Sequence, residues 1–570
     1  MNKELKLVNK KLLFFPEDFD VKDIDLVKES YNKLLKMPLD TGEDIVRCLE
    51  KKSELSMLIG DHLAWLYIDM TCNSNDETKS EAYTTYYNAI SSATEKIEFE
   101  LKKAIYESKA RYDLNGPSYT HLNKLLSNEI NLFVEENILI RQQITEIENK
   151  YGNLYGSLTV NLDGEEKTFA QLNVYLKNND RKIREQAWRL KMNKLNEHAE
   201  KFNEIFDAMK KLRIQEAKNA GFENYRDYMH QYKGRFAYTP DDLKEFHIAV
   251  EKAVIPYLKE IDTHRKQTLN LDSLRPWDVS VDLDGRKLNP FENTDELILK
   301  SINVLDKVDV EFAEQLLKMQ NSQYLDLDNR KGKAPGGYNY PIGRVNSSFI
   351  FMNAVGLHDD VTTLLHESGH AMHAKESAHI NIDKFKETPS EVAELASMSM
   401  ELLTMDYWKE FYPNPDDFKK AKREQLEGTL SFLPWCMTVD AFQHWIYTNP
   451  NHSVEERNTE FSKLMDRFNT IVDWVGLEKE KANRWILQLH IFEVPFYYIE
   501  YAMSQLGALA IYKNYKENPK EAIRNYKEFL KAGYTVPVDK LYEIAGVNFS
   551  FTEEYIQELV NFVKKELESC

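Results

Sequence analysis

The chain has 570 residues and a formal net charge of −19, with acidic residues spread along its length. Binding to a phosphate backbone needs a basic patch or stripe, so this charge pattern argues against a nucleic-acid partner. With 42% hydrophobic and 29% charged residues but only 20 Gly and 17 Pro, the composition favours long helices over a turn-rich β-sandwich or a disordered chain.

The first third of the sequence predicts antiparallel helices. Between Lys22 and Tyr151, apolar residues recur every three or four positions, and the segment Glu81–Tyr112 has no proline to interrupt it. Two short stretches instead alternate around an Asp-Gly dipeptide, namely Leu158–Phe169 and Asp278–Leu288. This pattern predicts two small β-hairpins inserted among the helices.

A Gly/Pro-rich loop, Lys331–Gly343, precedes a short apolar run, Ser347–Asn353. The aromatic residues and isoleucine of the run predict a strand. One interpretation is a buried strand of the core. The other is an edge strand whose free backbone groups pair with an extended peptide.

The strongest chemical signal is the sequence His366-Glu367-Ser-Gly-His370, which fits the H-E-x-x-H pattern within a predicted helix, Asp360–Glu376. Spacing of i and i+4 places both imidazoles on one helix face, where both can reach one metal ion. Glu367 then lies beside that ion as a candidate general base. The alternative is a solvated helix face with incidental histidines.

A catalytic zinc needs a third protein ligand and an open position for water. His373 lies one turn beyond His370, but three ligands from one straight helix would crowd around a tetrahedral ion. We therefore assign His373 to packing or to the outer shell of the site. The third ligand is expected further along the chain.

A second helix is predicted to start near Pro389. Thr388 is the expected N-cap, Pro389 the first helical residue, and Glu391 the residue that closes a capping box. Glu394 and Glu401 lie further inside on one face. Glu394 is the better candidate ligand, and Glu401 is a candidate partner that orients a ligand imidazole.

This arrangement resembles the oligoendopeptidase F and thimet oligopeptidase family of zinc metallopeptidases, whose HExGH motif matches His366–His370 with its glycine. In that family the third ligand is a glutamate just under thirty residues after the first histidine, which implies Glu394. Further similar segments are Leu274–Asp278, Pro335–Tyr338 and the stretch from His490 to Ala502. The resemblance spans about Tyr225 to Tyr512 and is greater to bacterial oligoendopeptidases than to the larger thimet enzymes.

The resemblance implies one zinc ion per chain, held by His366, His370 and Glu394, with Glu367 as the base. It also places hydrogen-bond donors to the reacting carbonyl at His490, Tyr501 and Tyr497, with Tyr498 as an alternative tyrosine. The expected activity is hydrolysis of internal bonds in short unfolded peptides. Two alternatives remain open: a zinc carboxypeptidase or dipeptidyl carboxypeptidase on the same scaffold, and a non-catalytic peptide-binding helical protein.

The resemblance further implies a mainly α, two-part helical body with a deep substrate channel and small β insertions near the zinc site. Residues 1–200 are expected to form a helical region that covers the channel, and residues 201–570 the catalytic region. Short peptides are the expected partners, and the oligomeric state is left open.

The cysteines and the apolar segments predict a cytoplasmic location. No signal-peptide pattern opens the sequence. The most apolar long stretch, Phe496–Tyr512, is too short for a membrane span and contains Glu500. The four cysteines are far apart and show no CxxC pairing, as expected for reduced thiols: Cys48, Cys72, Cys436 and Cys570.

Overall fold

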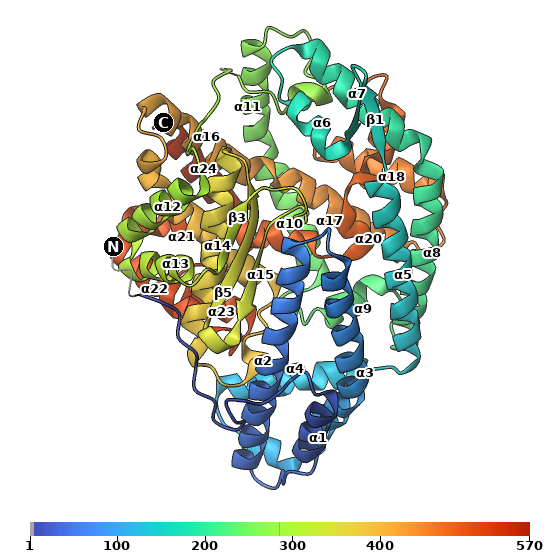
Figure 1. Ribbon diagram of the computed structural model, residues 1–570. Helices are drawn as coiled ribbons and strands as arrows, with labels where there is room; N and C mark the ends of the chain where they lie inside the picture. The colour runs from blue at the N-terminus through green and yellow to red at the C-terminus, as the bar shows by residue number, and fades with distance from the viewer. Residues whose placement is uncertain (1–4, 284, 570) are drawn as a thin grey trace.

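Helices form most of the protein in the computed structural model, which describes residues 5–283 and 285–569 (Figure 1). The predicted mainly α class is confirmed. The chain begins with four helices. Three of them have a side-chain N-cap: Asp23, Thr41 and Asp76 each accept a hydrogen bond from a backbone N–H in the first turn. These helices are α1 (Ile24–Leu35), α2 (Gly42–Cys72), α3 (Glu77–Glu107) and α4 (Pro117–Leu132).

The next part of the chain adds a helical wall and one hairpin. The predicted hairpin at Leu158–Phe169 is confirmed as β1 (Thr159–Leu162) and β2 (Glu165–Thr168). Its turn residues Asp163 and Gly164 have φ of 55° and 90°, as a two-residue turn between antiparallel strands requires. The helices here are α5 (Glu136–Gly156), α6 (Phe169–Leu176), α7 (Arg181–Glu197), α8 (Ala199–Asn219), α9 (Tyr225–Tyr232), α10 (Pro240–Ala253) and α11 (Ile255–Thr268).

The second predicted hairpin, at Asp278–Leu288, is wrong. Pro276–Asp278 forms a 3₁₀ turn, and residues 279–283 and 285–288 contain no strand; Asp284 lies outside the described residues. The buried Asp278 carboxylate accepts hydrogen bonds from Arg181 and Arg184 on α7. The segment is therefore held by side chains of a helix rather than by a partner strand.

A three-stranded sheet lies next to the motif helix in the order β3 (Leu325–Asp328), β5 (Ser347–Ala354), β4 (Tyr338–Ile342). The strand predicted at Ser347–Asn353 is confirmed as β5. Its interpretation as an edge strand is wrong, because β5 pairs in parallel with β3 and antiparallel with β4. In this sheet β4 and β3 are the edges.

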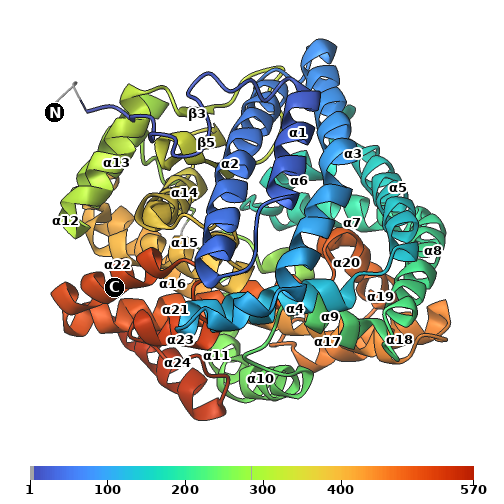
Figure 2. The same cartoon turned by 90° about the horizontal axis from the view of Figure 1, so that it is seen from below.

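Behind the sheet, helices pack in succession: α14 (His358–Glu376) on β5, α15 (Ser390–Thr404) on α14, and α21 (Tyr498–Glu517) on α15 (Figures 1 and 2). A Cβ added to Gly369 of α14 would lie 2.6 Å from the Cα of Ser397 on α15. Only glycine permits this close approach. The remaining helices of this half are α12 (Thr294–Val308), α13 (Val310–Asn321), α16 (Pro415–Ser431), α17 (Leu433–Thr448), α18 (Val454–Arg467), α19 (Glu478–Asn483), α20 (Leu489–Glu493), α22 (Pro519–Ala532), α23 (Val538–Ile544) and α24 (Glu553–Glu568).

Two large apolar cores organise the described residues. The larger one runs from Leu125 to Leu567 and includes α14, α15 and α21. The other belongs to the first four helices and takes in Ile380, Ile382 and Phe385 from the segment that joins α14 to α15. That connection therefore anchors the motif helix to the N-terminal helices. The division at residue 200 and the deep channel stay predictions.

Two expectations from the sequence concern the state of the cysteines and the presence of a membrane-spanning helix. Cys48, Cys72 and Cys436 are free thiols, and Cys570 lies outside the described residues. Within residues 5–283 and 285–569, no helix combines the length and the apolar character that crossing a bilayer requires.

Candidate metal centre and active site

Two imidazoles and one carboxylate converge between α14 and α15. The Nε2 atoms of His366 and His370 lie 3.3 and 4.0 Å from Oε2 of Glu394, and one ligand atom from each of the three residues falls within 4.8 Å of the others. Ligands at about 2.1 Å from a tetrahedral zinc are about 3.4 Å apart. The three predicted ligands are thus brought together at a spacing and with a donor set that fit zinc.

The local sequence explains how α14 presents its histidines. The carboxylate of Asp360 accepts hydrogen bonds from the backbone N–H groups of Val355 and Leu357, which fixes the start of the helix. The i,i+4 spacing then places the two imidazoles edge to face, with ring centroids 5.0 Å apart and planes at 83°. Gly369 faces α15 and allows that helix to come close enough for Glu394 to reach both rings.

Glu401 orients the first histidine. Nδ1 of His366 lies 2.7 Å from Oε1 of Glu401, whose other oxygen accepts a hydrogen bond from Gln425 at 2.8 Å. With its proton on Nδ1, the ring leaves Nε2 free for a metal. Burial lowers the pKa of His366, but hydrogen bonds with Glu394 and Glu401 outweigh it and raise the pKa well above the usual value. Burial lowers the pKa of His370 to about 3.

Glu367 follows His366 on α14 but is not one of the three predicted metal ligands. Its side chain makes no hydrogen bond with other residues in the described part of the chain, and burial raises its pKa to about 7. Its backbone carbonyl accepts a hydrogen bond from Asn339 of β4 at 3.0 Å. A carboxyl group with such a pKa can accept and return protons near neutral pH.

His373 does not join the metal ligands. Its ring is buried against Phe529, with centroids 5.8 Å apart, and burial lowers its pKa to about 4. Its assignment to packing agrees with this position.

The expected start of the second helix needs correction. α15 begins at Ser390 with Pro389 as N-cap, so neither Thr388 nor Glu391 plays the capping role predicted for it. Glu391 instead points inward, is only 2% exposed, and accepts a hydrogen bond from Tyr238 at 3.3 Å. The extended backbone of Pro389, with ψ of 160°, already provides the cap geometry. Glu391 is therefore free to face the core.

An aromatic cluster on α20 and α21 borders the ligands. The hydroxyl of Tyr497 lies 3.5 Å from Oε1 of Glu394, and its ring centroid lies 5.8 Å from that of His490 and 5.1 Å from that of Tyr501. Tyr498 packs against His490, with ring centroids 4.8 Å apart, and against Phe432 at 5.6 Å. Of these residues, Tyr497 is the one with a hydrogen bond to a predicted ligand.

The tautomer of His490 follows from its neighbours. Trp435 Nε1 donates to Oε1 of Gln488 at 2.7 Å, so the Gln488 amide nitrogen faces His490 Nδ1 at 2.6 Å. Nδ1 then accepts, and the proton of the neutral ring sits on Nε2. Burial lowers the pKa of His490 to about 4, which favours this neutral ring. His490 can therefore donate a hydrogen bond from Nε2.

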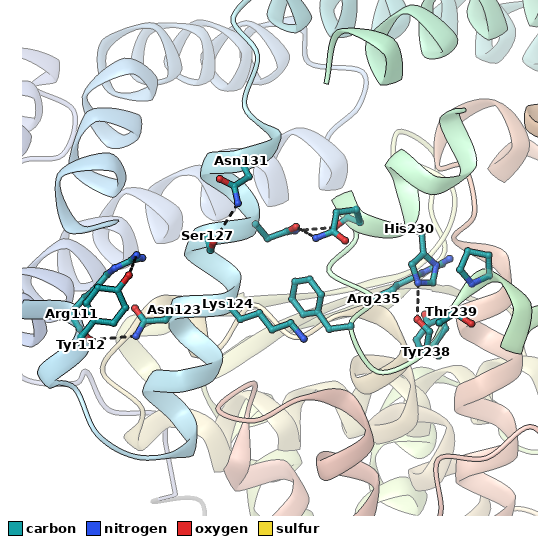
Figure 3. Close-up of a pocket in the computed structure, with 14 residues that line it drawn as sticks. Arg111, Tyr112, Asn123, Lys124, Ser127, Asn131, His230, Arg235, Tyr238 and Thr239 are labelled. Carbon is teal, nitrogen blue, oxygen red and sulfur yellow. Dashed lines mark hydrogen bonds between the residues drawn. The ribbon is translucent and has the colours of Figure 1, made fainter. Parts of the chain in front are cut away.

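A pocket of about 660 Å³ lies outside this centre, between α4 and the loop that joins α9 to α10 (Figure 3). It contains none of the predicted site residues. Lys124, His230 and Arg235 line it, and His230 is hydrogen-bonded to the carbonyl of Tyr238 at 2.7 Å. The pocket is thus distinct from the metal centre.

The sequence interpretation did not find Gln425, Gln443, Gln488, Asn339 or Arg235, which support the centre from other elements. Of these five, only Gln488 lies close in sequence to the residue that it supports, two positions before His490. The others lie far from their partners in sequence and belong to no motif.

The helical fold, together with two histidines of an H-E-x-x-H helix and a glutamate on the adjoining helix, defines a metallopeptidase. A profile described as peptidase family M3 matches residues 174–561, and one described as the peptidase M3 N-terminal domain matches residues 14–133. The chain belongs to peptidase family M3 and is a metalloendopeptidase. The resemblance to oligoendopeptidase F is confirmed.

Individual relatives agree with this assignment. An oligoendopeptidase F homolog of Borreliella burgdorferi is 26% identical over 96% of this chain and 91% of its own length. Oligopeptidase PepF of Bacillus subtilis is 26% identical over 52% of this chain and 44% of its own. The solved structure of PZ peptidase A with inhibitor 2 has a TM-score of 0.88 and 26% identity, and the match covers 98% of this chain and 99% of that one.

Proposed function

We propose that the protein is a zinc-dependent endopeptidase that hydrolyses internal bonds of short unfolded peptides. The observation that carries the proposal is the convergence of His366, His370 and Glu394 next to the buried Glu367. One zinc ion per chain would be held by the three ligands. When bound, zinc supplies a Lewis acid that acidifies water and polarises a carbonyl group.

Glu367 is the proton carrier in this proposal. Its carboxylate takes a proton from the attacking water and returns it to the amine that leaves. Burial keeps the carboxylate weakly solvated and its pKa near neutral, so both transfers are accessible at the same pH. The hydrogen bond from Nδ1 of His366 to Glu401 holds the imidazole ring in place during these proton transfers.

Tyr497, Tyr501 and His490 are proposed to stabilise the negative charge that develops on the substrate carbonyl oxygen. The Tyr497 hydroxyl reaches the edge of the ligand set, and His490 has its proton on the nitrogen that is free to donate. Tyr501 packs against both rings. Donors fixed before the reaction stabilise the transition state more than the substrate.

An extended substrate would pair with β4 rather than with β5. β4 is an edge strand, and Asn339 connects it to the backbone of Glu367, so a peptide along this edge would run past the proposed base. Residues 1–200 are proposed to cover this site and to select short unfolded chains. A cytoplasmic location, suggested by the unpaired cysteines, stays part of the proposal.

The rival carboxypeptidase activity would need a cation that binds the substrate's terminal carboxylate. Lys233 lies near the centre, with Nζ 5.1 Å from the Tyr497 ring centroid, but it is paired with Glu500 at 3.1 Å. This pairing favours the endopeptidase. A non-catalytic peptide-binding protein would have no need of the buried base Glu367.

The test is cleavage of an internally quenched peptide of about ten residues with both ends blocked, together with metal analysis of the same sample. We expect internal cleavage that is lost when zinc is removed and restored when it is returned. The same sequence placed in a surface loop of a folded protein should be spared. Strict dependence on a free C-terminus would favour the carboxypeptidase, and equal cleavage of the loop would contradict the covered site.

A further inference from the structure

Phe496, the residue before Tyr497, has a left-handed backbone. Its φ is 61°, although it is neither glycine nor asparagine, and it is 1% exposed. Such a conformation is unfavourable for an L-residue, because Cβ comes close to a backbone carbonyl oxygen. Surrounding contacts must therefore hold it, and these contacts set the direction in which the chain enters α21.

Both backbone polar groups of Phe496 are bound by side chains from distant elements. Its N–H donates to Oε1 of Gln443 on α17 at 2.9 Å. Its carbonyl accepts a close hydrogen bond from Nη2 of Arg235, which lies in the loop after α9. Its ring packs against those of His444 and Tyr447, each with a centroid separation of 5.6 Å.

Arg235 also binds the first turn of α21. The same Nη2 lies 2.6 Å from Oε1 of Glu500, and both side chains are almost fully buried. One guanidinium thus holds the residue before Tyr497 and the residue three positions after it. Both contacts use Nη2, at the far end of the guanidinium. A lysine would keep the charge, but its ammonium group lies one bond closer to Cα and would not reach both acceptors from the same backbone position.

We propose that Arg235 is a positioning residue, which places the hydroxyl of Tyr497 beside Oε1 of Glu394 by fixing the backbone on both sides of Tyr497. The inference rests on the proposed function of Tyr497 as a donor to the substrate. Without the clamp, Phe496 would relax towards an ordinary backbone conformation, and Glu500 in the first turn of α21 would keep only Lys233 as its counter-charge. The 3.5 Å contact between Tyr497 and Glu394 would then be lost.

The pocket described above gives access to Arg235 from outside the metal centre. Arg235 is one of its lining residues, together with His230 of α9 and Tyr238, and Figure 3 shows the three at one end of the pocket. The volume of about 660 Å³ is ample for a guanidinium ion. A small cation added to the solution can therefore reach the space that a truncated side chain would leave.

Three variants test the proposal. Arg235→Lys keeps the charge, Arg235→Ala opens the space, and Gln443→Met removes the acceptor for the Phe496 N–H while keeping the side-chain length. The matched control is Arg184→Lys, because Arg184 is also buried and binds both a carbonyl, that of Trp277, and a carboxylate, that of Asp278.

For Arg235→Lys and Gln443→Met we expect kcat to fall about 10- to 100-fold, with KM within about threefold and zinc content unchanged, since a transition-state donor is displaced. Millimolar guanidinium should restore part of the activity of Arg235→Ala. In the metal-free proteins, backbone amides of residues 496–501 should exchange with deuterium at least about tenfold faster than in the wild type. Arg184→Lys should change neither kcat nor this exchange.

Wild-type exchange at residues 496–501 in Arg235→Lys and Gln443→Met would overturn the inference, whatever the activity. Equal losses of kcat in Arg184→Lys would also overturn it, since the effect would then be general destabilisation. Absence of zinc-dependent cleavage by the wild type would instead contradict the proposed function. The exchange measurement on metal-free protein would still decide the role of Arg235.

Discussion

Gly369→Ala should weaken zinc binding without changing a ligand. A Cβ at this position would lie 2.6 Å from Ser397 Cα, 2.9 Å from the Ala396 carbonyl oxygen and 3.1 Å from Met400 Cβ. The first two are backbone atoms and cannot rotate away. Restoring an ordinary contact requires α14 and α15 to separate by about 0.8 Å, whereas zinc ligands tolerate about 0.2 Å.

The expected change in the free energy of unfolding is the difference between the cost of overpacking and the gain from a better helix-forming residue. Overpacking at a helix crossing costs about 1–3 kcal/mol, and replacing glycine by alanine within a helix returns about 1 kcal/mol. We therefore expect the free energy of unfolding of the metal-free protein to fall by about 1 kcal/mol. Because His366 and His370 lie on α14 and Glu394 on α15, the same separation should lower zinc affinity by about 10- to 100-fold.

The assay combines denaturant unfolding of the metal-free protein with a competition titration for zinc. Gly428→Ala is the matched control: Gly428 lies within α16, and an added Cβ would meet no atom within 4 Å. This control should gain up to about 1 kcal/mol of stability and bind zinc normally. Wild-type zinc affinity in Gly369→Ala would refute the idea that the helix crossing sets the ligand geometry.

Four further substitutions test individual carboxylates. Glu367→Gln should keep zinc and lose about 100-fold or more in kcat, measured with the blocked peptide; activity within tenfold of the wild type would contradict its role as base. Glu394→Ala should abolish stoichiometric zinc in metal analysis, whereas Glu391→Gln should retain it; the reverse result would move the ligand to Glu391. Glu401→Gln should lower zinc affinity by about 10- to 100-fold by weakening the orientation of His366, and an unchanged dissociation constant would exclude that role.

Local signals predicted the parts of the site that depend on near neighbours in sequence. The i,i+4 pair His366 and His370 needs only a helix to share a face, and the structure provides it as α14. The turn at Asp163 and Gly164 also encodes its own backbone conformation, so the first hairpin was predictable. In both cases the determining contacts lie within a few residues.

Features that depend on distant partners could not be predicted in this way. A strand pattern does not reveal how many neighbours a strand has, so the sequence of β5 was consistent with both a central and an edge position. Asp278 begins a segment that contains an Asp-Gly dipeptide typical of hairpins, but arginines about a hundred positions earlier bind its carboxylate. Arg235 and Phe496 are separated by 261 positions, and no motif connects them.

The two buried glutamates at the start of α15 show how the surroundings decide between structure and chemistry. Glu391 and Glu394 lie one turn apart on the same helix, and both are under 10% exposed. Burial and the nearby Glu500 raise the pKa of Glu391 to about 7, although Arg235 opposes this. Burial also acts on Glu394, but hydrogen bonds and charge from His366 outweigh it and lower its pKa. Because a cation binds the ionised carboxylate, we propose that the imidazoles of α14 favour Glu394 as the ligand, a choice that the spacing within α15 alone could not make.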